Sequence, residues 1–503
     1  MKKLLILLVL LGWASVSCND DFLDTPPLSS PSDETFWTSE ANAITWINNA
    51  YRSLPSANDY QFDSMSDDCV GAGDLVAQGL LVPTSAIAAT EWDFTYIRHC
   101  LQLLEKLDAI PGLSEQGKKQ LAGQARFILS FKYFEMTNLY GDVPLVDKVY
   151  ALPDSDIPKT EKSKVVEYIL AQLATAYDEL PLTWPASETG RITKGAILAL
   201  KARVLLYNAR WQEAAAAAKQ LMDLGQYELH ANYAEVFQTA FNNKTKEVIL
   251  AHQYAKDLYT HTLCFAYGYY SIGGTSSSLP LPDLVNAYES KDGLPITESP
   301  LYDAKDFGNN RDPRFRMNFI LPFESIGGQK YDPVNNLNDK NAAKTYIYFR
   351  KYISDMASQQ RTMWVNWNIF RYAEVLLTYA EAQNEASGPD ASVYEAINLI
   401  RKRAGMPAID QKRYNTRNEL REAIRNERRV EMAGEGLRYF DILRWKTAEK
   451  VLNKEVVSIE VPGVLPLRII HTRRFDASKD YQWPIPQAAI DNAKNLKQNP
   501  SWE

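Results

Sequence analysis

The chain has 503 residues and a formal net charge of −7, and 46% of its residues are hydrophobic and 11% aromatic. An acidic chain offers no basic field to attract phosphates, so nucleic acid is excluded as a partner. The apolar share can fill a large core, and the length predicts two or three domains or one large one. The five histidines are scattered without the spacing of metal ligands, so no metal site is predicted.

The first predicted element is a secretory signal over residues 1–17. Lys2 and Lys3 precede an apolar run that ends at Leu11, and small residues follow it. The run is far shorter than the roughly 20 residues that a membrane-spanning helix needs. Cys18 then stands where a bacterial lipoprotein carries its lipidated cysteine. We expect Cys18 to be lipidated; the alternative is an ordinary cleaved signal with an incidental cysteine.

Acids and prolines follow at once, in "CNDDFLDTPP". Such a composition predicts an extended, solvated tether over residues 18–40, which holds the body off a membrane surface outside the cytoplasm. Beyond the tether, Cys69, Cys100 and Cys264 remain. Their spacing does not indicate a disulfide.

The middle of the chain is strongly helical. Phe127, Phe131 and Phe134 recur at i, i+4 and i+7, which predicts an apolar stripe on one helix face. Gly141 and then Pro144 supply the stop signal.

A second helical stretch reads "GRITKGAILALKARVLLYNARWQEAAAAAKQLMDLG". Thr193 is a predicted N-cap, and a break at 208–210 separates a second helix that starts near Trp211. The pair resembles a tetratricopeptide unit, which needs neighbours to bury its faces. Candidate helical partners are residues 91–140, 163–182 and 366–405.

Two long stretches, residues 55–95 and 252–365, lack helical periodicity. Loops this long in a compact protein are usually functional or disordered. Their many tyrosines and tryptophans disfavour disorder. We therefore expect a mainly α fold: tetratricopeptide-like helical hairpins within 91–225 and 366–450 on one side of a single large globule, and a loop-rich, ligand-binding half.

One segment has the pattern of a catalytic site. In "LREAIRNERRVEMAGEGLRYFDILRW", Glu427 and Glu431 continue the apolar stripe of Leu420 and Ile424. Two inward carboxylates could be the acid and nucleophile of a secreted glycoside hydrolase. The alternative is a pair of buried ion pairs with nearby arginines, whose charge would lower the pKa values of the carboxyls, whereas a general acid needs a raised pKa. The arginine-rich neighbourhood favours the ion pairs.

The same segment resembles the signature of the SusD-like (RagB/SusD) family of outer-membrane nutrient-binding lipoproteins, through "NERRVEMAGEGLRYFDILRW". Further blocks follow the family order and extend the resemblance over the whole mature chain: "GQARFILSFKYFEMTNLYGDVPLV", "GRITKGAILALKARVLLY", "NRDPRF", "FRYAEVLLTYAEAQNEA", "INLIRKRAGMP" and "PIPQAAIDNAKNLKQNPSW".

The resemblance implies a SusD-like globule over residues 41–503, lipid-anchored in the outer membrane and facing the cell exterior. It implies capture of glycans, or of peptides in some relatives, for a SusC-like TonB-dependent β-barrel transporter. The acids after Cys18 look like the surface-export signal of such lipoproteins. The family is not catalytic. No cofactor is predicted; the Asp-rich loops would permit calcium without predicting it. A purely structural tetratricopeptide adaptor is disfavoured by the amount of aromatic loop.

Ligand candidates follow from the chemistry of sugar binding, in which flat aromatic faces stack on a sugar ring and Asp, Asn and Arg hydrogen-bond around it. By the resemblance, Asp67, Asp68 and Trp92 lie in stretches that carry ligand contacts in several relatives. The alternatives are turn and cap chemistry for the two aspartates and core packing for Trp92.

The other ligand candidates lie in "FAYGYYSIGG" and "RTMWVNW". They are Tyr267, Tyr269, Tyr270, Arg361 and Trp364. For the tyrosines, the alternative is a strand with one buried face, and Arg361 could simply be solvated. We expect Trp367 and Phe370 in the core.

Overall fold

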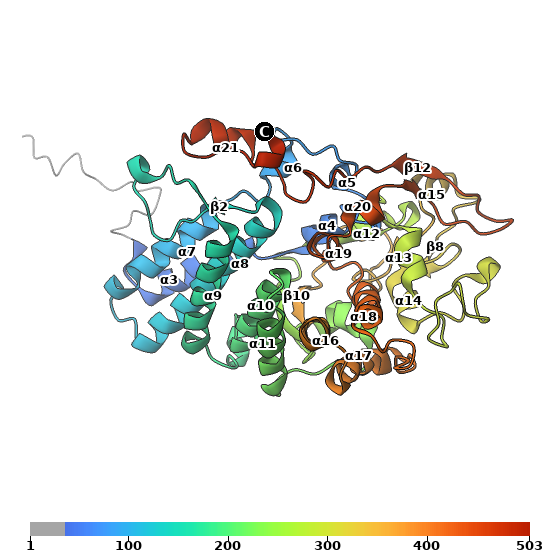
Figure 1. Cartoon of the computed structure of the whole chain (residues 1–503), viewed down its shortest axis with the longest axis horizontal. Helices are drawn as coiled ribbons and strands as arrows, with labels where there is room; N and C mark the ends of the chain where they lie inside the picture. The colour runs from blue at the N-terminus through green and yellow to red at the C-terminus, as the bar shows by residue number, and fades with distance from the viewer. Residues whose placement is uncertain (1–35) are drawn as a thin grey trace, which may run out of the picture.

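The computed structural model describes residues 36–503 (Figure 1). The predicted signal over 1–17, Cys18 and all but the end of the tether lie outside the described residues. Among the residues that are described, no helix is both long and apolar enough to cross a membrane.

Helices dominate one side of the molecule (Figure 1). They are α3 (Glu40–Ala50), α7 (Thr95–Lys106), α8 (Glu115–Tyr140), α9 (Lys162–Glu179), α10 (Lys194–Tyr207), α11 (Trp211–Asp223), α16 (Tyr372–Ser387), α17 (Ala391–Ala404), α18 (Arg417–Glu431) and α19 (Arg438–Arg444). From α3 to α18 they pack in a continuous row: α3 on α7, α7 on α8, α8 on α9, α9 on α10, α10 on α11, α11 on α16, and α16 on α17 and α18. The row continues from α11 to α16 although residues 224–371 intervene. The predicted helical hairpins are confirmed.

Local signals in the sequence set the ends of these helices. The Ser114 and Thr193 side chains accept hydrogen bonds from the backbone of the first turns of α8 and α10, as N-caps do. Gly141 ends α8 with a φ of +75°, a conformation that glycine adopts without strain. The predicted cap at Thr193 and the stop at Gly141 are both confirmed.

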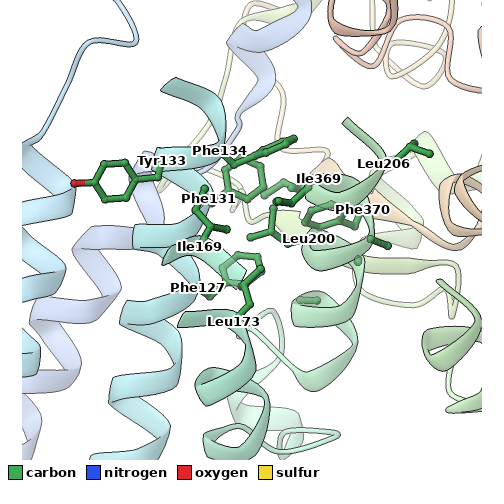
Figure 2. Close-up of a cluster of buried hydrophobic side chains, with 14 of the residues drawn as sticks. Phe127, Phe131, Tyr133, Phe134, Ile169, Leu173, Leu200, Leu206, Ile369 and Phe370 are labelled. Atoms are coloured by element: carbon green, nitrogen blue, oxygen red, sulfur yellow. The ribbon is translucent and has the colours of Figure 1, made fainter. Parts of the chain in front are cut away.

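The core of the helical side forms around α8 (Figure 2). Phe127, Phe131 and Phe134 point from α8 toward α9 and α10, and all three are buried. Phe131 lies 6.0 Å, between ring centroids, from Phe370 of strand β10 (Trp367–Arg371). The apolar stripe predicted from the sequence thus packs α8 against its neighbours and, through Phe370, against strand β10.

The remaining elements are short and are linked by loops; most lie on the other side of the molecule, whereas β2, α6 and α21 lie near α7 and α8 (Figure 1). The strands form antiparallel pairs: β1 (Cys69–Gly71) with β5 (Ser278–Pro280), β4 (Val248–His252) with β10, β2 (Val143–Pro144) with β3 (Lys159–Thr160), β6 (Phe319–Ile320) with β9 (Tyr348–Phe349), β7 (Ser325–Ile326) with β8 (Gln329–Lys330), and β11 (Glu455–Val457) with β12 (Ile469–Thr472). The short helices are α4 (Gln61–Ser64), α5 (Asp74–Ala77), α6 (Ala86–Ala89), α12 (Leu263–Tyr267), α13 (Pro282–Ala287), α14 (Pro313–Asn318), α15 (Leu337–Ala342), α20 (Ala448–Leu452) and α21 (Gln487–Asn492).

This loop-rich half has its own core, built mainly from aromatic rings. Tyr288, Phe315 and Phe319 pack edge to face in it, with ring centroids 5.2 to 5.6 Å apart. Edge-to-face contacts of this kind stabilise a core beyond the area that they bury. Much of the aromatic content of residues 252–365 therefore serves packing and does not form a binding surface.

Two elements contribute to both cores. Strand β10 places Trp367 in the aromatic core and Phe370 in the helical core, and α18 does the same with Val430 and Ile424. Trp367 and Phe370 are buried as predicted. The two halves are therefore packed as one globule.

Candidate binding site

The two aspartates predicted to contact ligand are buried. Asp67 and Asp68 are 2% and 1% exposed. Arg438 Nε lies 2.8 Å from Asp67 Oδ1, and Arg429 Nη2 lies 2.5 Å from Asp68 Oδ1. Burial raises the pKa of both carboxyls, but for Asp67 the two arginines outweigh burial and hold the pKa below its usual range. The sequence-based role is corrected: these carboxylates fasten the loop to α18 and α19 and do not face a ligand.

Two of the three candidate tyrosines are also buried. The Tyr267 hydroxyl donates to the Gly434 carbonyl at 3.2 Å, and the Tyr269 hydroxyl donates to the Gln329 carbonyl at 2.5 Å. Both rings are fully buried in the aromatic core, so their predicted ligand contact is corrected to a packing role. Tyr270, the next residue, is 53% exposed and remains a candidate.

Arg361 and Trp364 lie on a loop that runs beside the segment carrying Tyr270. The two segments, called the loop pair from here on, are residues 254–273 and 357–366. His261 and Met363 exchange backbone hydrogen bonds of 2.9 and 2.8 Å, and the Gln359 backbone N–H donates to the Ile272 carbonyl. The loop pair is thus held by main-chain hydrogen bonds at both ends.

Cations and aromatic rings alternate on the loop pair. Lys256 Nζ lies 5.5 Å from the ring centre of the half-buried Trp364, and the Arg361 guanidinium lies 5.7 Å from that of Phe265. These distances are within the range of cation–π attraction. An exposed cation over an aromatic ring can move aside for a ligand, so Trp364 remains a candidate stacking surface.

A polar pocket of about 230 Å³ lies next to this loop pair. Its wall includes Trp184, Arg191, Tyr227, Asn243 and Gln253. The volume is below the roughly 300–1,000 Å³ of sites for drug-sized ligands. The pocket therefore fits one small polar unit of a larger ligand better than the whole of it.

Four amide side chains connect the polar pocket to Trp364. Asn243 and Gln253 line the pocket, and the Asn366 side-chain amide donates to both of them at 3.1 Å. Asn242 Nδ2 donates to the Trp364 carbonyl at 2.8 Å, and its Oδ1 accepts from the Asn366 backbone. This amide cluster fixes the Trp364 backbone to the pocket wall, so the two form one candidate site.

Trp92 lines a different hollow. Its ring packs edge to face on Tyr140 at 4.9 Å and is half-buried. The hollow is a largely apolar groove of about 420 Å³, with Phe94, Val146 and Leu496 in its wall. Trp92 therefore packs on Tyr140 and also lines the groove, and its ligand contact stays a prediction.

The candidate acid pair, Glu427 and Glu431, is enclosed by arginines. Arg314 Nη1 lies 2.6 Å from Glu427 Oε1 and 2.9 Å from Glu431 Oε2, and Arg371 Nη1 lies 3.0 Å from Glu431 Oε1. Arg403 Nη2 lies 2.5 Å from the same Glu431 oxygen. Burial raises the pKa of Glu431, but the arginines outweigh it and hold the pKa well below its usual range.

The carboxylates are thus structural, as their spacing among arginines indicated. The partners differ from those that the sequence suggested, because they come from α14, β10 and α17 and not from α18 and α19. A glycosidase acid needs access to substrate and a raised pKa, and Glu431 has neither. Among residues 36–503, no group of three or more His, Cys, Asp and Glu side chains could hold a metal ion.

The pocket residues Trp184, Arg191 and Tyr227 were not predicted from the sequence. A signal was present, because Trp184 stands in the proline-containing connection between two predicted helices, where a loop tryptophan is a candidate for ligand contact. The approach of Asn243 and Gln253 to residues 364–366 is a tertiary contact that local sequence does not encode.

Comparisons with known proteins give a consistent result. A model of the SusD family matches residues 237–502, and a second model, described as starch-binding and associating with the outer membrane, matches residues 21–206. The SusD-like protein P38 of Formosa agariphila is 26% identical over 98% of this chain and 97% of its own length. A SusD-like protein of Bacteroides ovatus is 25% identical over 90% of this chain and 84% of its own length.

Solved structures share the whole architecture. A SusD-like carbohydrate-binding protein of Bacteroides fragilis superposes with a TM-score of 0.84 at 28% identity, over 92% of this chain and all of its own. A surface glycan-binding protein of Bacteroides fluxus has the same fold at 22% identity, with a TM-score of 0.69 over 92% of this chain and 99% of its own.

Proposed function

The chain belongs to the SusD family, and on that basis we propose that it is a cell-surface lipoprotein that binds a glycan and delivers it to a SusC-like TonB-dependent transporter in the outer membrane. As a SusD-family protein it is a binding protein and not an enzyme. A description as starch-binding and associated with the outer membrane belongs to the family model that matches residues 21–206, and it supports the general location.

The observation that carries the proposal is the junction of Trp364 with the polar pocket. A sugar ring presents an apolar C–H face and a rim of hydroxyls, so it needs an aromatic plane beside fixed donors and acceptors. Trp364 supplies the plane, and Asn243 and Gln253 supply amide groups held by Asn366. The related carbohydrate-binding protein of Bacteroides fragilis, at 28% identity, supports the same ligand class.

Anchoring and partner belong to the same proposal. Lipidation of Cys18 would hold the protein at the membrane, because each acyl-chain methylene that enters the bilayer contributes about 0.8 kcal/mol to the binding free energy. The predicted tether would let the globule turn toward the mouth of a barrel, with the row from α3 to α18 as its contact surface and the loop pair facing the ligand. Export to the outer face of the cell is supported by the acids that follow Cys18.

The test is calorimetric titration with a panel of plant, host and microbial oligosaccharides. We expect one glycan class to bind, and Trp364→Ala to weaken that binding at least tenfold, because a buried tryptophan contact is typically worth more than about 1.4 kcal/mol. Phe323→Ala is the matched control: Phe323 is an exposed aromatic residue on the β7–β8 side of the molecule. Equal binding by wild type and Trp364→Ala would place the glycan elsewhere, and binding of peptides but no glycan would favour peptide cargo.

A further inference from the structure

A second pocket, distinct from the candidate glycan site, lies on the surface formed by α18, α19 and α20. It has a volume of about 220 Å³ and is called the basic pocket here. Its wall includes Arg425, Arg429, Arg438, Trp445 and Lys450. The cations come from three consecutive helices, which pack so that these side chains surround one recess.

The charges at the basic pocket are only partly balanced. Arg429 forms an ion pair with Asp68, and Arg438 forms one with Asp67, so their charges are neutralised. Lys450 is exposed and forms no ion pair with any carboxylate in residues 36–503. The remaining acid in the wall is Glu422, an exposed side chain 3.3 Å from Arg425 Nη1, and an exposed pair of that kind contributes little.

Arg425 is the least satisfied of these cations. Its Nε is buried and, within the described part of the chain, has no hydrogen-bond partner. Burial is the main cause that lowers the pKa of Arg425; the carboxylates of Glu381 and Glu422 oppose it, and the charges of Arg444 and Arg421 add to it. The one carboxylate ion pair of Arg425 among the described residues is with the exposed Glu422, so an anion in the pocket would stabilise the Arg425 charge.

Trp445 holds the guanidinium groups in place. Its ring centre lies 4.6 Å from the Arg425 guanidinium and 5.7 Å from that of Arg438, and its Nε1 donates to Glu381 at 2.7 Å. Guanidinium groups fixed in this way present positive charge to a sulfate, phosphate or carboxylate group. Arg429 and Arg438 already donate Nε–H and Nη2–H to Asp67 and Asp68, so Arg425 and Lys450 are the cations left to pair with an added oxyanion. The pocket is therefore preorganised for an oxyanion.

We propose that the basic pocket binds an oxyanion carried by an acidic saccharide, such as a sulfate ester or a uronate carboxylate. The oxyanion site stands on the pocket alone, and its saccharide carrier rests on the proposed function. A polyanion such as nucleic acid does not fit, because the chain as a whole carries a net charge of −7.

The test uses the full chain in detergent and three probes: sodium sulfate, a sulfated monosaccharide and its neutral parent sugar. We expect saturable binding of the two anions, weakened at least tenfold by Arg425→Gln or Lys450→Gln and weakened by added sodium chloride. Arg413→Gln, which removes an exposed arginine paired with Glu298, is the matched control and should leave binding unchanged. Arg429 and Arg438 are left intact because they hold the fold.

Several results would overturn the proposal. No saturable binding of either anion, or equal binding by wild type, Arg425→Gln and Lys450→Gln, removes the oxyanion site. If inorganic sulfate binds but the sulfated monosaccharide does not, the pocket is an oxyanion site and the proposed saccharide carrier is wrong. The outcome is independent of the Trp364→Ala result, because a neutral glycan makes no use of this pocket.

Discussion

Glu431 shows how one residue can look catalytic and be structural. Its carboxylate is fully buried and contacts Arg314, Arg371 and Arg403, which reach it from α14, β10 and α17. Because each arginine also contacts other carboxylates, the group forms a network that ties α18 to the rest of the molecule.

Removing the Glu431 charge should therefore destabilise the fold. Glu431→Gln leaves buried guanidinium groups short of a partner, and breaking a buried pair in this way costs about 3–5 kcal/mol. Chemical denaturation should show this loss as a lower midpoint. The matched control, Glu298→Gln, removes an exposed partner of Arg413 and should leave the midpoint almost unchanged. An unchanged midpoint for Glu431→Gln would mean that the network is dispensable.

For these residues, the sequence predicted which side chains are buried better than it predicted which side chains they contact. The stripe of Leu420, Ile424, Glu427 and Glu431 correctly indicated inward carboxylates. It could not indicate Arg314 or Arg371, because those contacts join positions far apart in the chain. The same limit explains Asp67 and Asp68, whose arginines lie at the other end of the sequence.

Among the elements, the loop pair depends on a neutral histidine. His261 Nε2 donates to the Val365 carbonyl at 3.0 Å, and the Leu263 backbone N–H donates to His261 Nδ1 at 3.2 Å. Only the neutral ring can both donate and accept in this way. Burial is the main cause that lowers the pKa of His261 to about 4.

Acid should therefore loosen the loop pair. Because the folded pKa lies below the unfolded value of about 6.5, this contribution is complete above pH 6.5 and is lost as the pH falls toward 4. The His261→Gln variant can keep one donor and one acceptor and has no ring to protonate. Between pH 7.5 and 4, its free energy of unfolding should fall by less than that of the wild type, and the difference should be up to about 3 kcal/mol. Denaturation curves at the two pH values would measure these free energies of unfolding. His230→Gln, at a partly exposed histidine, is the control. Equal losses in wild type and His261→Gln would contradict this role.

The turn that positions Tyr270 depends on a close backbone approach. A Cβ on Gly274 would lie 1.9 Å from the Gly268 carbonyl oxygen. Gly274→Ala should therefore open the turn, lower the denaturation midpoint and weaken glycan binding together. In Gly328→Ala, the control, the new Cβ meets no atom within 4 Å, and only the left-handed backbone (φ +77°) opposes it, at roughly 1–2 kcal/mol. A smaller effect at Gly274 than at Gly328 would contradict the proposed constraint.

Regular elements were predictable and loops were not. The helices α8, α10 and α11 follow from periodic apolar residues and recognisable caps, all of which are local signals. The loop-rich half has no such period, and its tyrosines looked alike in the sequence. Tyr269 and Tyr270 are neighbours, yet one is buried and the other exposed, because the surrounding loops decide which ring faces the core.

For the whole molecule, the shared elements β10 and α18 predict cooperative unfolding. Cys100 lies in the helical core and Cys264 in the aromatic core, and both are buried free thiols. Phe131→Ala should destabilise the helical core by about 3–5 kcal/mol. Because the cores share β10 and α18, both thiols should become reactive at the same denaturant concentration, in wild type and in Phe131→Ala. Earlier reaction of Cys100 alone would show that the halves unfold separately.

This SusD-family protein captures a glycan without changing it, and one experiment can test both parts of that statement. The most direct measurement is calorimetric titration of the soluble chain, residues 21–503, with the oligosaccharide panel, followed by product analysis of the same mixtures. We expect saturable binding of one glycan class, with every oligosaccharide recovered intact. Recovery of shortened oligosaccharides, or no binding of any glycan, would contradict it.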